Sequence, residues 1–383
     1  MPHYKFDQIA FNITDKKMPE PGDEKMYIGL EHLDSGSLKI TRWGSEVELT
    51  GQKLVMKKGD VLFGRRNTYL RRAAIAPHDG IFSAHGMIFR PKTQVIDPEY
   101  FPFFISSNYF MDAAIRISVG SLSPTVNWKT LKELEFDLPS LEEQRKNAAL
   151  LKSINETKEA YQELLIQTDS LVKSQFIEMF GLPESNVHGF EIGTIGDVVK
   201  DVHYGTAKKA SEDGKYIYIR MNNITYEGEL DLSDIKRIDV PDKELAGCIV
   251  QQGDVLFNRT NSKDLVGKTC YFSGNEPMII AGYIIRLRMN GKVIPEYLSI
   301  FMNLDRSKKL LYSMAKGAVG QANINAQEVQ SIEIVIPPYE MQKEFLQLLK
   351  QSDKSKFELK EAIKSCDALM KAILFTNLEE KEG

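Results

Sequence analysis

"GDVLF" stands at residues 59–63 of the chain, and the same stretch returns at residues 253–257. The residues after the two copies differ: the first continues as GRRNTYLRRAAIA (64–76) and the second as NRTNSKDLVGKTC (258–270). A recurring apolar stretch followed by unlike polar residues indicates one structural element used twice, with a different loop attached each time. The fold therefore depends on how far the repeat extends.

The similarity extends over much of the chain. Further matches recur in the same order, at separations that grow only from 194 to 198 residues. They are Pro98-Glu99-Tyr100 and Pro295-Glu296-Tyr297, Gly120 and Gly317, Asn127 and Asn325, Pro139 and Pro337, and Gln144 and Gln342. Ordered matches with so few insertions indicate a tandem duplication whose period is near half of the chain length.

Composition limits the class of protein. A length of 383 residues predicts two or three domains, and 42% hydrophobic with 27% charged residues is typical of a soluble globular protein. No apolar run approaches the ~20 residues of a membrane span, and the N-terminus lacks a signal-peptide pattern. The three cysteines have no metal-ligand spacing, which favours a reducing, cytoplasmic location. A net charge of −4 excludes a chain that is basic throughout, but it is compatible with a local basic patch.

Each copy begins with a globular part. Residues 1–138 and residues 182–336 mix alternating, strand-like stretches with helix-spaced apolar residues. LEFDL (134–138) and IEIVI (332–336) are two such strand-like stretches, and each ends its globular part. The pattern predicts one α/β (α+β) domain in each copy.

Each copy ends in a long helical run. Gly and Pro are absent from Leu141 to Phe180 and from Tyr339 to Phe375, and apolar residues recur mostly three or four positions apart, with an interruption at Lys158. A run of this length makes a helix of ~60 Å. One apolar stripe on each helix favours an antiparallel coiled coil that separates the two domains; two unrelated helices on separate cores are the alternative. The predicted boundaries are 139–181 for the first spacer helix, 337–378 for the second and 379–383 for a tail.

The chain contains no recognisable catalytic motif. SKDLVGKT (262–269) resembles a P-loop, but Ser262 stands where the first glycine must wrap a phosphate. IPPY (336–339) has the prolines and the aromatic of a DNA amino-methyltransferase, but Ile336 cannot accept a hydrogen bond from the base. Pro241-Asp242 lacks the acidic and lysine residues of a nuclease, and the six histidines form no ligand pair. We therefore expect no catalytic residue, metal site or cofactor in this chain.

Two loops at equivalent places carry side chains that can contact nucleic acid. Arginine pairs with guanine and neutralises phosphate, asparagine pairs with adenine, and an aromatic ring packs on a sugar or base. The candidates after the first repeated stretch are Arg65, Arg66, Asn67, Tyr69, Arg71 and Arg72. Those after the second are Asn258, Arg259, Thr260, Asn261, Ser262, Lys263 and Lys268. Polar groups at both places favour DNA recognition over the alternative, an ordinary solvated surface.

These stretches resemble the specificity subunits of Type I restriction-modification systems, and the resemblance covers essentially the whole chain. Its most specific segments are GDVLFNRTNSKDLVGK (253–268), LPSLEEQRK (138–146), LVKSQFIEMFG (171–181) and IPPYEMQKE (336–344). YIGLEHLDSGSL (27–38) and GRRNTYLRRAAIA (64–76) are similar to one class of target recognition domain in the same family.

The resemblance implies two target recognition domains in a pseudo-two-fold tandem repeat, separated by the two long helices as an antiparallel coiled coil. Each domain would read one half of an interrupted, asymmetric sequence in double-stranded DNA. Two modification (methyltransferase) subunits would dock on the repeated scaffold and supply S-adenosylmethionine and adenine methylation. Restriction/translocase subunits would add ATP- and Mg-dependent translocation and cleavage. The chain itself would not be an enzyme, and the helix length would set the gap between the half-sites.

The two copies differ at places that bear on these roles. Met341 replaces the second Glu of LPSLEEQ, so the two docking surfaces need not be equally strong. Arg65 and Arg259 each stand two residues past the repeated stretch, which makes them the first pair to compare. A recognition subunit of a related fused restriction-modification system, and a protein-binding scaffold with no DNA role, are the alternative functions.

Overall fold

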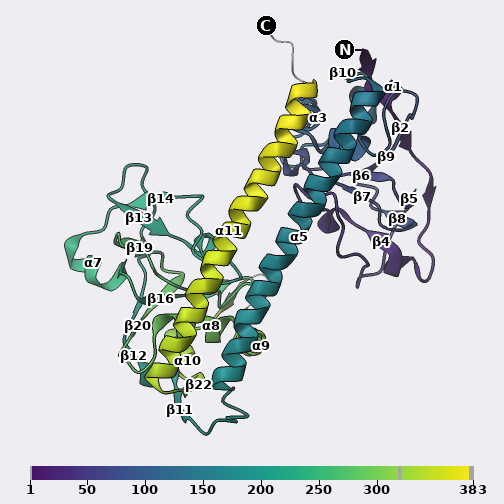
Figure 1. The fold of residues 1–383 in the computed structure, drawn as a ribbon. Coiled ribbons are helices and arrows are strands. Elements are labelled where there is room, and N and C mark those ends of the chain that lie inside the picture. Colours follow the sequence, from purple (N-terminus) through teal and green to yellow (C-terminus); the bar gives the residue numbers. More distant parts are fainter. Residues whose placement is uncertain (1, 318–320, 379–383) are drawn as a thin grey trace. The chain divides into compact units, whose positions relative to one another are not determined.

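The computed structural model describes residues 2–317 and 321–378, so the predicted tail lies outside the described residues. The chain divides into two compact units: unit 1 comprises Met1–Glu163 with Leu359–Gly383, and unit 2 comprises Leu164–Glu358. Two 40-residue helices, α5 (Leu141–Phe180) and α11 (Tyr339–Leu378), each contribute to both units (Figure 1). The long helices predicted from the Gly- and Pro-free runs are therefore present, although the compact units divide within them and not at their ends.

Unit 1 is built on an antiparallel sheet of four strands in the order β2-β9-β6-β7. A second sheet has the order β3-β5-β8-β4, in which β4 and β8 are parallel. Strands β1 and β10 pair near the start of α5. The bounds are β1 (His3–Lys5), α1 (Phe6–Ile9), β2 (Ala10–Ile13), β3 (Lys16–Lys17), η1 (Asp23–Met26), β4 (Tyr27–Ile28), η2 (Leu30–His32), β5 (Lys53–Met56), β6 (Val61–Phe63), η3 (Thr68–Leu70), β7 (Ala73–Ile75), β8 (Gly80–Phe82), β9 (Met87–Pro91), α2 (Phe101–Ser106), α3 (Asn108–Arg116), α4 (Trp128–Leu131) and β10 (Glu135–Asp137).

Unit 2 repeats this plan with β12-β20-β16-β18 as its main sheet and β14-β13-β19-β15 as its second sheet, in which β13 and β19 are parallel. The edge strand of the second sheet differs, because β3 pairs with β5 in unit 1 whereas β14 pairs with β13 in unit 2. The bounds are β11 (Glu191–Thr194), α6 (Ile195–Val198), β12 (Val199–Tyr204), β13 (Tyr216–Ile219), η4 (Met221–Asn223), β14 (Lys236–Ile238), α7 (Asp242–Cys248), β15 (Ile249–Val250), β16 (Asp254–Asn258), β17 (Thr260–Asn261), β18 (Thr269–Tyr271), β19 (Met278–Ile280), β20 (Ile284–Met289), α8 (Pro295–Asn303), α9 (Asp305–Met314), β21 (Ala322–Asn323), α10 (Ala326–Gln330) and β22 (Glu333–Ile336).

The repeated GDVLF stretch leads into one of the two central strands of each main sheet, β6 in unit 1 and β16 in unit 2. Because successive side chains on a strand point to opposite faces, the Val and the Phe lie in the main core of each unit, whereas the Leu lies in a separate, smaller core. The glycine precedes the strand in a turn with φ of +88° in unit 1 and +89° in unit 2, a conformation that other residues rarely adopt. The glycine, valine, leucine and phenylalanine of the stretch therefore each have the same structural role in both units.

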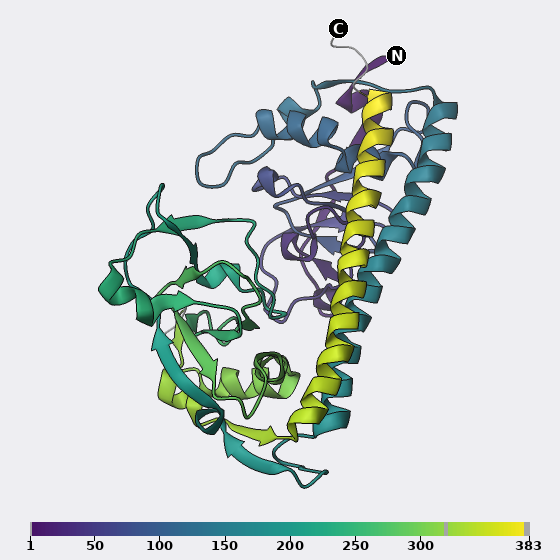
Figure 2. The same cartoon turned by 60° about the vertical axis from the view of Figure 1, so that its left-hand side comes forward.

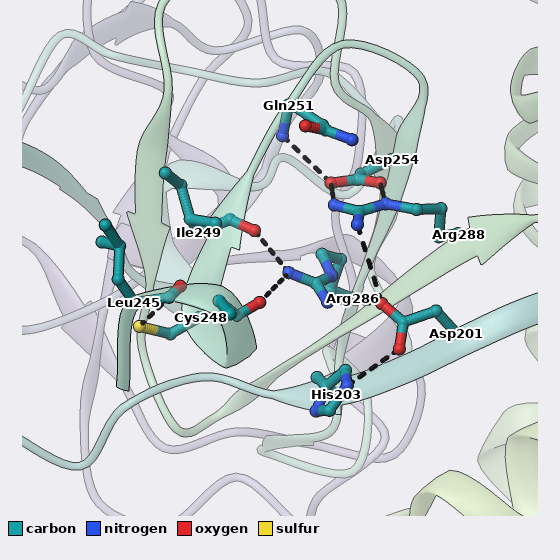
Figure 3. A network of polar contacts seen from close by, with 10 residues as sticks. Asp201, His203, Leu245, Cys248, Ile249, Gln251, Asp254, Arg286 and Arg288 are labelled. Carbon is teal, nitrogen blue, oxygen red and sulfur yellow. Dashed lines mark hydrogen bonds and ion pairs between the residues drawn. The ribbon is translucent and has the colours of Figure 1, made fainter. Parts of the chain in front are cut away.

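The aspartate of GDVLF forms the same buried ion pair twice. Asp60 accepts two hydrogen bonds from the guanidinium of Arg90, at 2.6 and 2.9 Å, and Asp254 accepts two from Arg288, at 2.7 and 2.9 Å. The aspartate side chains are only 4% and 1% exposed. In unit 2, Figure 3 shows Arg288 between Asp254 and a second carboxylate, that of Asp201, which lies 3.8 Å from it. A bidentate contact of this kind fixes the pairing of the two central strands.

The repeated glutamines attach the long helices to the globular parts. Gln144 accepts from the amide of Asp97 at 2.7 Å and donates to the carbonyls of Val95 and Pro139. Gln342 makes the same set, accepting from Ile294 at 2.9 Å and donating to Lys292 and Pro337. Both glutamines are almost fully buried. Each side-chain amide thus satisfies three backbone groups at the entry to a long helix.

The long helices run antiparallel within each unit. In unit 1, Ala148 and Leu151 near the start of α5 share a core with Leu374 near the end of α11. In unit 2, Phe176 near the end of α5 packs against Phe345 near the start of α11, with ring centroids 5.5 Å apart. Both views show these parts of the helices side by side (Figure 1 and Figure 2). The predicted antiparallel helix pair is confirmed. No helix within the described residues is long and apolar enough to cross a membrane.

Candidate nucleic-acid interface

The loop after β6 in unit 1, residues 64–72, is closed by its own backbone, and we call it the basic loop. The amide of Gly64 donates to the carbonyl of Arg72 at 2.9 Å. Asn67 and Arg71 adopt left-handed conformations, with φ of 54° and 49°, on either side of η3. This conformation is uncommon for a non-glycine residue, so the loop needs side-chain contacts that hold it in shape.

The six candidate side chains of the basic loop have different roles. Arg71 donates to Asn108 at 3.2 Å and pairs with Asp112, and both partners lie on α3. Arg71 therefore holds the loop against that helix. Arg66 and Tyr69 are exposed, with 56% of Tyr69 accessible. Arg65, Asn67 and Arg72 are partly buried.

The equivalent loop of unit 2, residues 258–268, is set more deeply in the fold, and we call it the amide loop. Asn258 is fully buried, and its side-chain amide donates to two backbone carbonyls at 3.1 Å. Thr260 is also buried and donates to Asn323 Oδ1 at 2.7 Å, while Lys268 donates to a backbone carbonyl at 2.6 Å. Burial also lowers the pKa of Lys268. Asn258, Thr260 and Lys268 therefore use these donors inside the fold, where they hold the loop in place.

The other members of the amide loop divide between internal and surface contacts. Asn261 donates to Asn258 Oδ1 at 2.9 Å and accepts from the amide of Ser262 at 2.9 Å, so its side chain shapes the turn. Lys263 is exposed, and its Nζ lies 4.4 Å from the centroid of the Tyr312 ring. The ring thereby holds the cation at the surface, and no carboxylate of the described residues pairs with it.

Arg65 and Arg259 occupy the same backbone position in the two units. The carbonyl of Arg65 accepts from the amide of Val126 at 2.9 Å, and the carbonyl of Arg259 accepts from the amide of Ile324 at 3.0 Å. Within the described residues, neither arginine pairs with a carboxylate, and the Nε of each is buried without a hydrogen-bond partner. The guanidinium of Arg259 lies over the ring of Tyr204, 4.9 Å from its centroid. Both units therefore hold an arginine at this point whose charge is not neutralised within the fold.

A second loop adjoins each of these loops, and the sequence interpretation missed it. In unit 1, residues 117–126 approach the basic loop through the bridge between Arg66 and Thr125. Leu122, in this second loop, is 95% exposed. In unit 2, β17 of the amide loop pairs with β21, although residues 318–320 of its second loop lie outside the described residues. The repeated Gly120/Gly317 pair lies within these second loops and the Asn127/Asn325 pair follows them, and these pairs are the signal that could have identified the loops.

Comparison with known proteins agrees with this arrangement. The model of the family described as Type I restriction modification DNA specificity domain matches twice, at residues 11–167 and 187–365, and these matches cover well over half of the chain. The Type I restriction enzyme EcoKI specificity subunit of Escherichia coli K12 is 24% identical over 296 residues, which are 72% of this chain and 62% of the relative. The StySPI specificity subunit of Salmonella potsdam is 24% identical over 321 residues, which are 78% of this chain and 68% of the relative. The chain thus spans about three fifths of the E. coli relative.

Solved structures share the fold. A chain from a type I R-M system, studied for its complex assembly and conformational transition, has a TM-score of 0.54 at 18% identity and covers 98% of this chain and 97% of its own length. The Type I restriction-modification system S subunit from M. genitalium has a TM-score of 0.50 at 14% identity, with 97% and 95% coverage. The double match of the family model, which covers most of the chain, shows that the chain belongs to the family described as Type I restriction modification DNA specificity domain.

Proposed function

We propose that this chain is the DNA-reading subunit of a Type I restriction-modification enzyme, and that each unit reads one half of an asymmetric, bipartite target in double-stranded DNA. One observation carries the proposal: the two units share the buried contacts around GDVLF and place Arg65 and Arg259 on the same backbone position, while the loops around these arginines differ. A shared scaffold with unlike loops is what the reading of two unlike half-sites requires.

The accessible side chains suit two kinds of contact. Arg66, Lys263 and the unpaired guanidinium groups of Arg65 and Arg259 can neutralise phosphates, and arginine can also pair with guanine in the major groove. Tyr69 offers a ring that can pack on a sugar or base. Phosphate contacts position the protein, whereas base contacts specify the sequence. The buried residues of the amide loop would act indirectly, because they hold Arg259 and Lys263 in place.

The long helices offer equivalent apolar side chains to partner subunits. Leu171 in unit 2 is 58% exposed and Leu369 in unit 1 is 55% exposed, and the two positions differ by the repeat distance of 198 residues. Exposed apolar side chains on an otherwise polar helix suit the centre of a protein interface. Their repetition supports the docking of two modification subunits in equivalent ways.

The catalytic chemistry would come from these partners. We propose that modification subunits bind S-adenosylmethionine and methylate adenine, and that restriction/translocase subunits use ATP and Mg to move and cut DNA. The present chain would supply recognition alone and would act in the cytoplasm, where these subunits and the DNA meet.

An exchange of one domain tests the proposal. Residues 1–138 are replaced by those of a relative, and methylated adenines are mapped genome-wide in cells that also contain the modification subunits. We expect one half of the methylated motif to change while the other half and the spacer are kept. The reciprocal exchange of residues 182–336 is the matched control and should change the other half. A chimaera that assembles with its partners but keeps the full original motif would contradict the proposal, as would methylation by this chain in isolation.

A further inference from the structure

The interruption in the apolar stripe of α5, Lys158, is a buried ion-pair member. Its side chain is 9% exposed, and its Nζ lies 2.7 Å from Asp367 Oδ1 on α11. The same Nζ donates to the carbonyl of Gly36, in the globular part of unit 1, at 3.1 Å. One ammonium group therefore joins both long helices and the globular part within unit 1.

Lys356 on α11 has the same position in unit 2. Its side chain is 14% exposed, and its Nζ lies 3.0 Å from Asp169 Oδ1 on α5. Asp353 lies 3.4 Å away on α11 itself, and Glu229 from the globular part lies 3.9 Å away. Burial opposes the charge of Lys356, but the hydrogen bond and charge of Asp169, with the neighbouring carboxylates, outweigh it and raise the pKa. Lys356 is therefore charged at neutral pH.

The two ion pairs are related by the repeat. Lys158 and Lys356 differ by 198 positions, and so do Asp169 and Asp367. The lysine of each copy pairs with the aspartate of the other copy, once in each unit. In each unit a third group comes from the globular part, although it is a carbonyl in unit 1 and a carboxylate in unit 2.

A buried, paired charge between two helices fixes how the helices are aligned along their length more than it raises the free energy of unfolding. Apolar side chains tolerate a slip of one helix along the other, because a shifted stripe still meets an apolar surface. A buried ammonium does not, since a slip separates it from its partner and leaves it against apolar side chains. Polar residues at such positions are known to specify register at some cost in stability.

We propose that Lys158 and Lys356 are positioning residues that fix the register of α5 against α11 and anchor each globular part to the helix pair. As a consequence they define a single spacer length between the two half-sites. This last step rests on the proposed function, whereas the effect on register does not.

Distance measurement between spin labels tests the register directly. Labels are placed on exposed positions of the two helices in unit 1, through Glu156→Cys and Ala368→Cys; the three native cysteines are buried, which directs labelling to the introduced ones. We expect one narrow distance distribution in the otherwise unchanged full-length chain. The double variant Lys158→Met and Lys356→Met should add populations in which one helix is displaced by about one turn, roughly 5.4 Å.

Control variants separate this role from ordinary stabilisation. Lys364→Met in unit 1 and Lys354→Met in unit 2 remove exposed lysines of the same helix and should leave the distribution narrow. Asp367 and Asp169 are 41% and 40% exposed, so their carboxylates remain solvated when the lysines are replaced, and the melting temperature should stay unchanged or rise. Lys158→Arg together with Lys356→Arg keeps a cation at both positions and should keep the distribution narrow.

The recognised DNA provides the second readout. With modification subunits present, the double methionine variant should methylate the original half-sites at additional spacings, one or two base pairs shorter or longer, since a base pair rises about 3.4 Å along the helix axis. A narrow distance distribution together with a single spacer in this variant would overturn the proposal. If the unchanged chain directs no methylation at all, the proposed function fails, and the spin-label distances still decide whether the lysines fix the register.

Discussion

The two units place different residues opposite the leucine of the repeated GDVLF stretch. Leu62 in unit 1 lies opposite Ile88, whereas its counterpart Leu256 in unit 2 lies opposite Arg286. Ile88 is fully buried in an apolar cluster, but Arg286, which is 1% exposed, needs polar partners. The partner of the repeated leucine is therefore apolar in unit 1 and charged in unit 2.

Arg286 finds its partners in segments that unit 1 lacks in this form. It donates to the carbonyl of Ile249 at the end of α7 (Figure 3). It also donates to the carbonyl of Ala246, and to Asp201 on β12 at 2.5 Å. A cation is favoured at the C-terminal end of a helix, where carbonyl groups are unpaired. The two units therefore share the Asp–Arg and glutamine contacts of the duplicated scaffold. They differ in the segments attached to the second sheet and in the residues that hold these segments, such as Arg286 in unit 2.

The largest expected effect tests the shared part of the comparison. Asp254→Ala leaves Arg288, which is 24% exposed, without its bidentate partner and should lower the free energy of unfolding of unit 2 by about 3–5 kcal/mol. Asp60→Ala should destabilise unit 1 by a similar amount, because Arg90 is 33% exposed, whereas Arg288 keeps Asp201 at 3.8 Å as a second carboxylate. Urea unfolding measures the free energy lost in each variant. Hydrogen exchange of the backbone amides then shows which of the two units has been destabilised.

An exposed ion pair provides the control for this prediction. Glu340 and Lys343 form an i,i+3 pair at the surface of α11, and Glu340→Ala should leave the free energy of unfolding nearly unchanged, because water and salt screen an exposed pair. If Asp254→Ala costs no more than this control, the buried Asp–Arg pair does not hold the central strands together.

A smaller effect sharpens the difference between the units. Lys308 on α9 stands where unit 1 has the buried Met111, since each is the fourth residue of its helix. Burial, together with the neighbouring Lys173, lowers the pKa of Lys308 from 10.5 to about 8. The charged form is therefore disfavoured in the folded state. The substitution Lys308→Met also removes the contact of Nζ with the Tyr226 ring, 4.8 Å from its centroid, so it should stabilise unit 2 by about 1–2 kcal/mol at pH 7.

The pH dependence follows from the direction of this shift. Between pH 8 and pH 10.5 the unfolded chain binds the proton of Lys308 more tightly than the folded chain does, so the stability of the unchanged protein rises with pH in this window. The advantage of Lys308→Met should therefore shrink as the pH rises from 8 towards 10, as measured by urea unfolding at each pH. Lys309→Met, at an exposed neighbouring position, is the control and should show no such trend. An advantage that stays constant across this range would refute the assignment.

Residue patterns predicted the architecture well because it depends on features that are visible along the chain. The absence of Gly and Pro from Leu141 and from Tyr339 onward marks where α5 and α11 begin. The matching GDVLF stretches locate the central strands for the same reason, since burial on both faces demands an apolar run.

The candidate site was only partly predictable, because a residue type does not show whether its polar group is already used. Asn258 and Lys268 have suitable chemistry for DNA, yet backbone carbonyls inside unit 2 take up their donors.

The replacement of Glu143 by Met341 also has a local cause. Glu143 accepts from the amide and hydroxyl of Ser140 at the start of α5, whereas Met341 packs on the core of unit 2. The difference expected to affect docking therefore also changes how each helix begins.

The equivalent arginines of the two loops offer the most direct test of the central claim, that each unit reads its own half-site. Arg65→Ala and Arg259→Ala are introduced separately, and methylated adenines are mapped genome-wide with the modification subunits present. Each variant should relax one position of a different half-site, at a cost of about 1–3 kcal/mol in binding, and leave the other half-site unchanged. If both variants keep the full motif and affinity, or if both relax the same half-site, the two units do not read separate halves of the target through these loops.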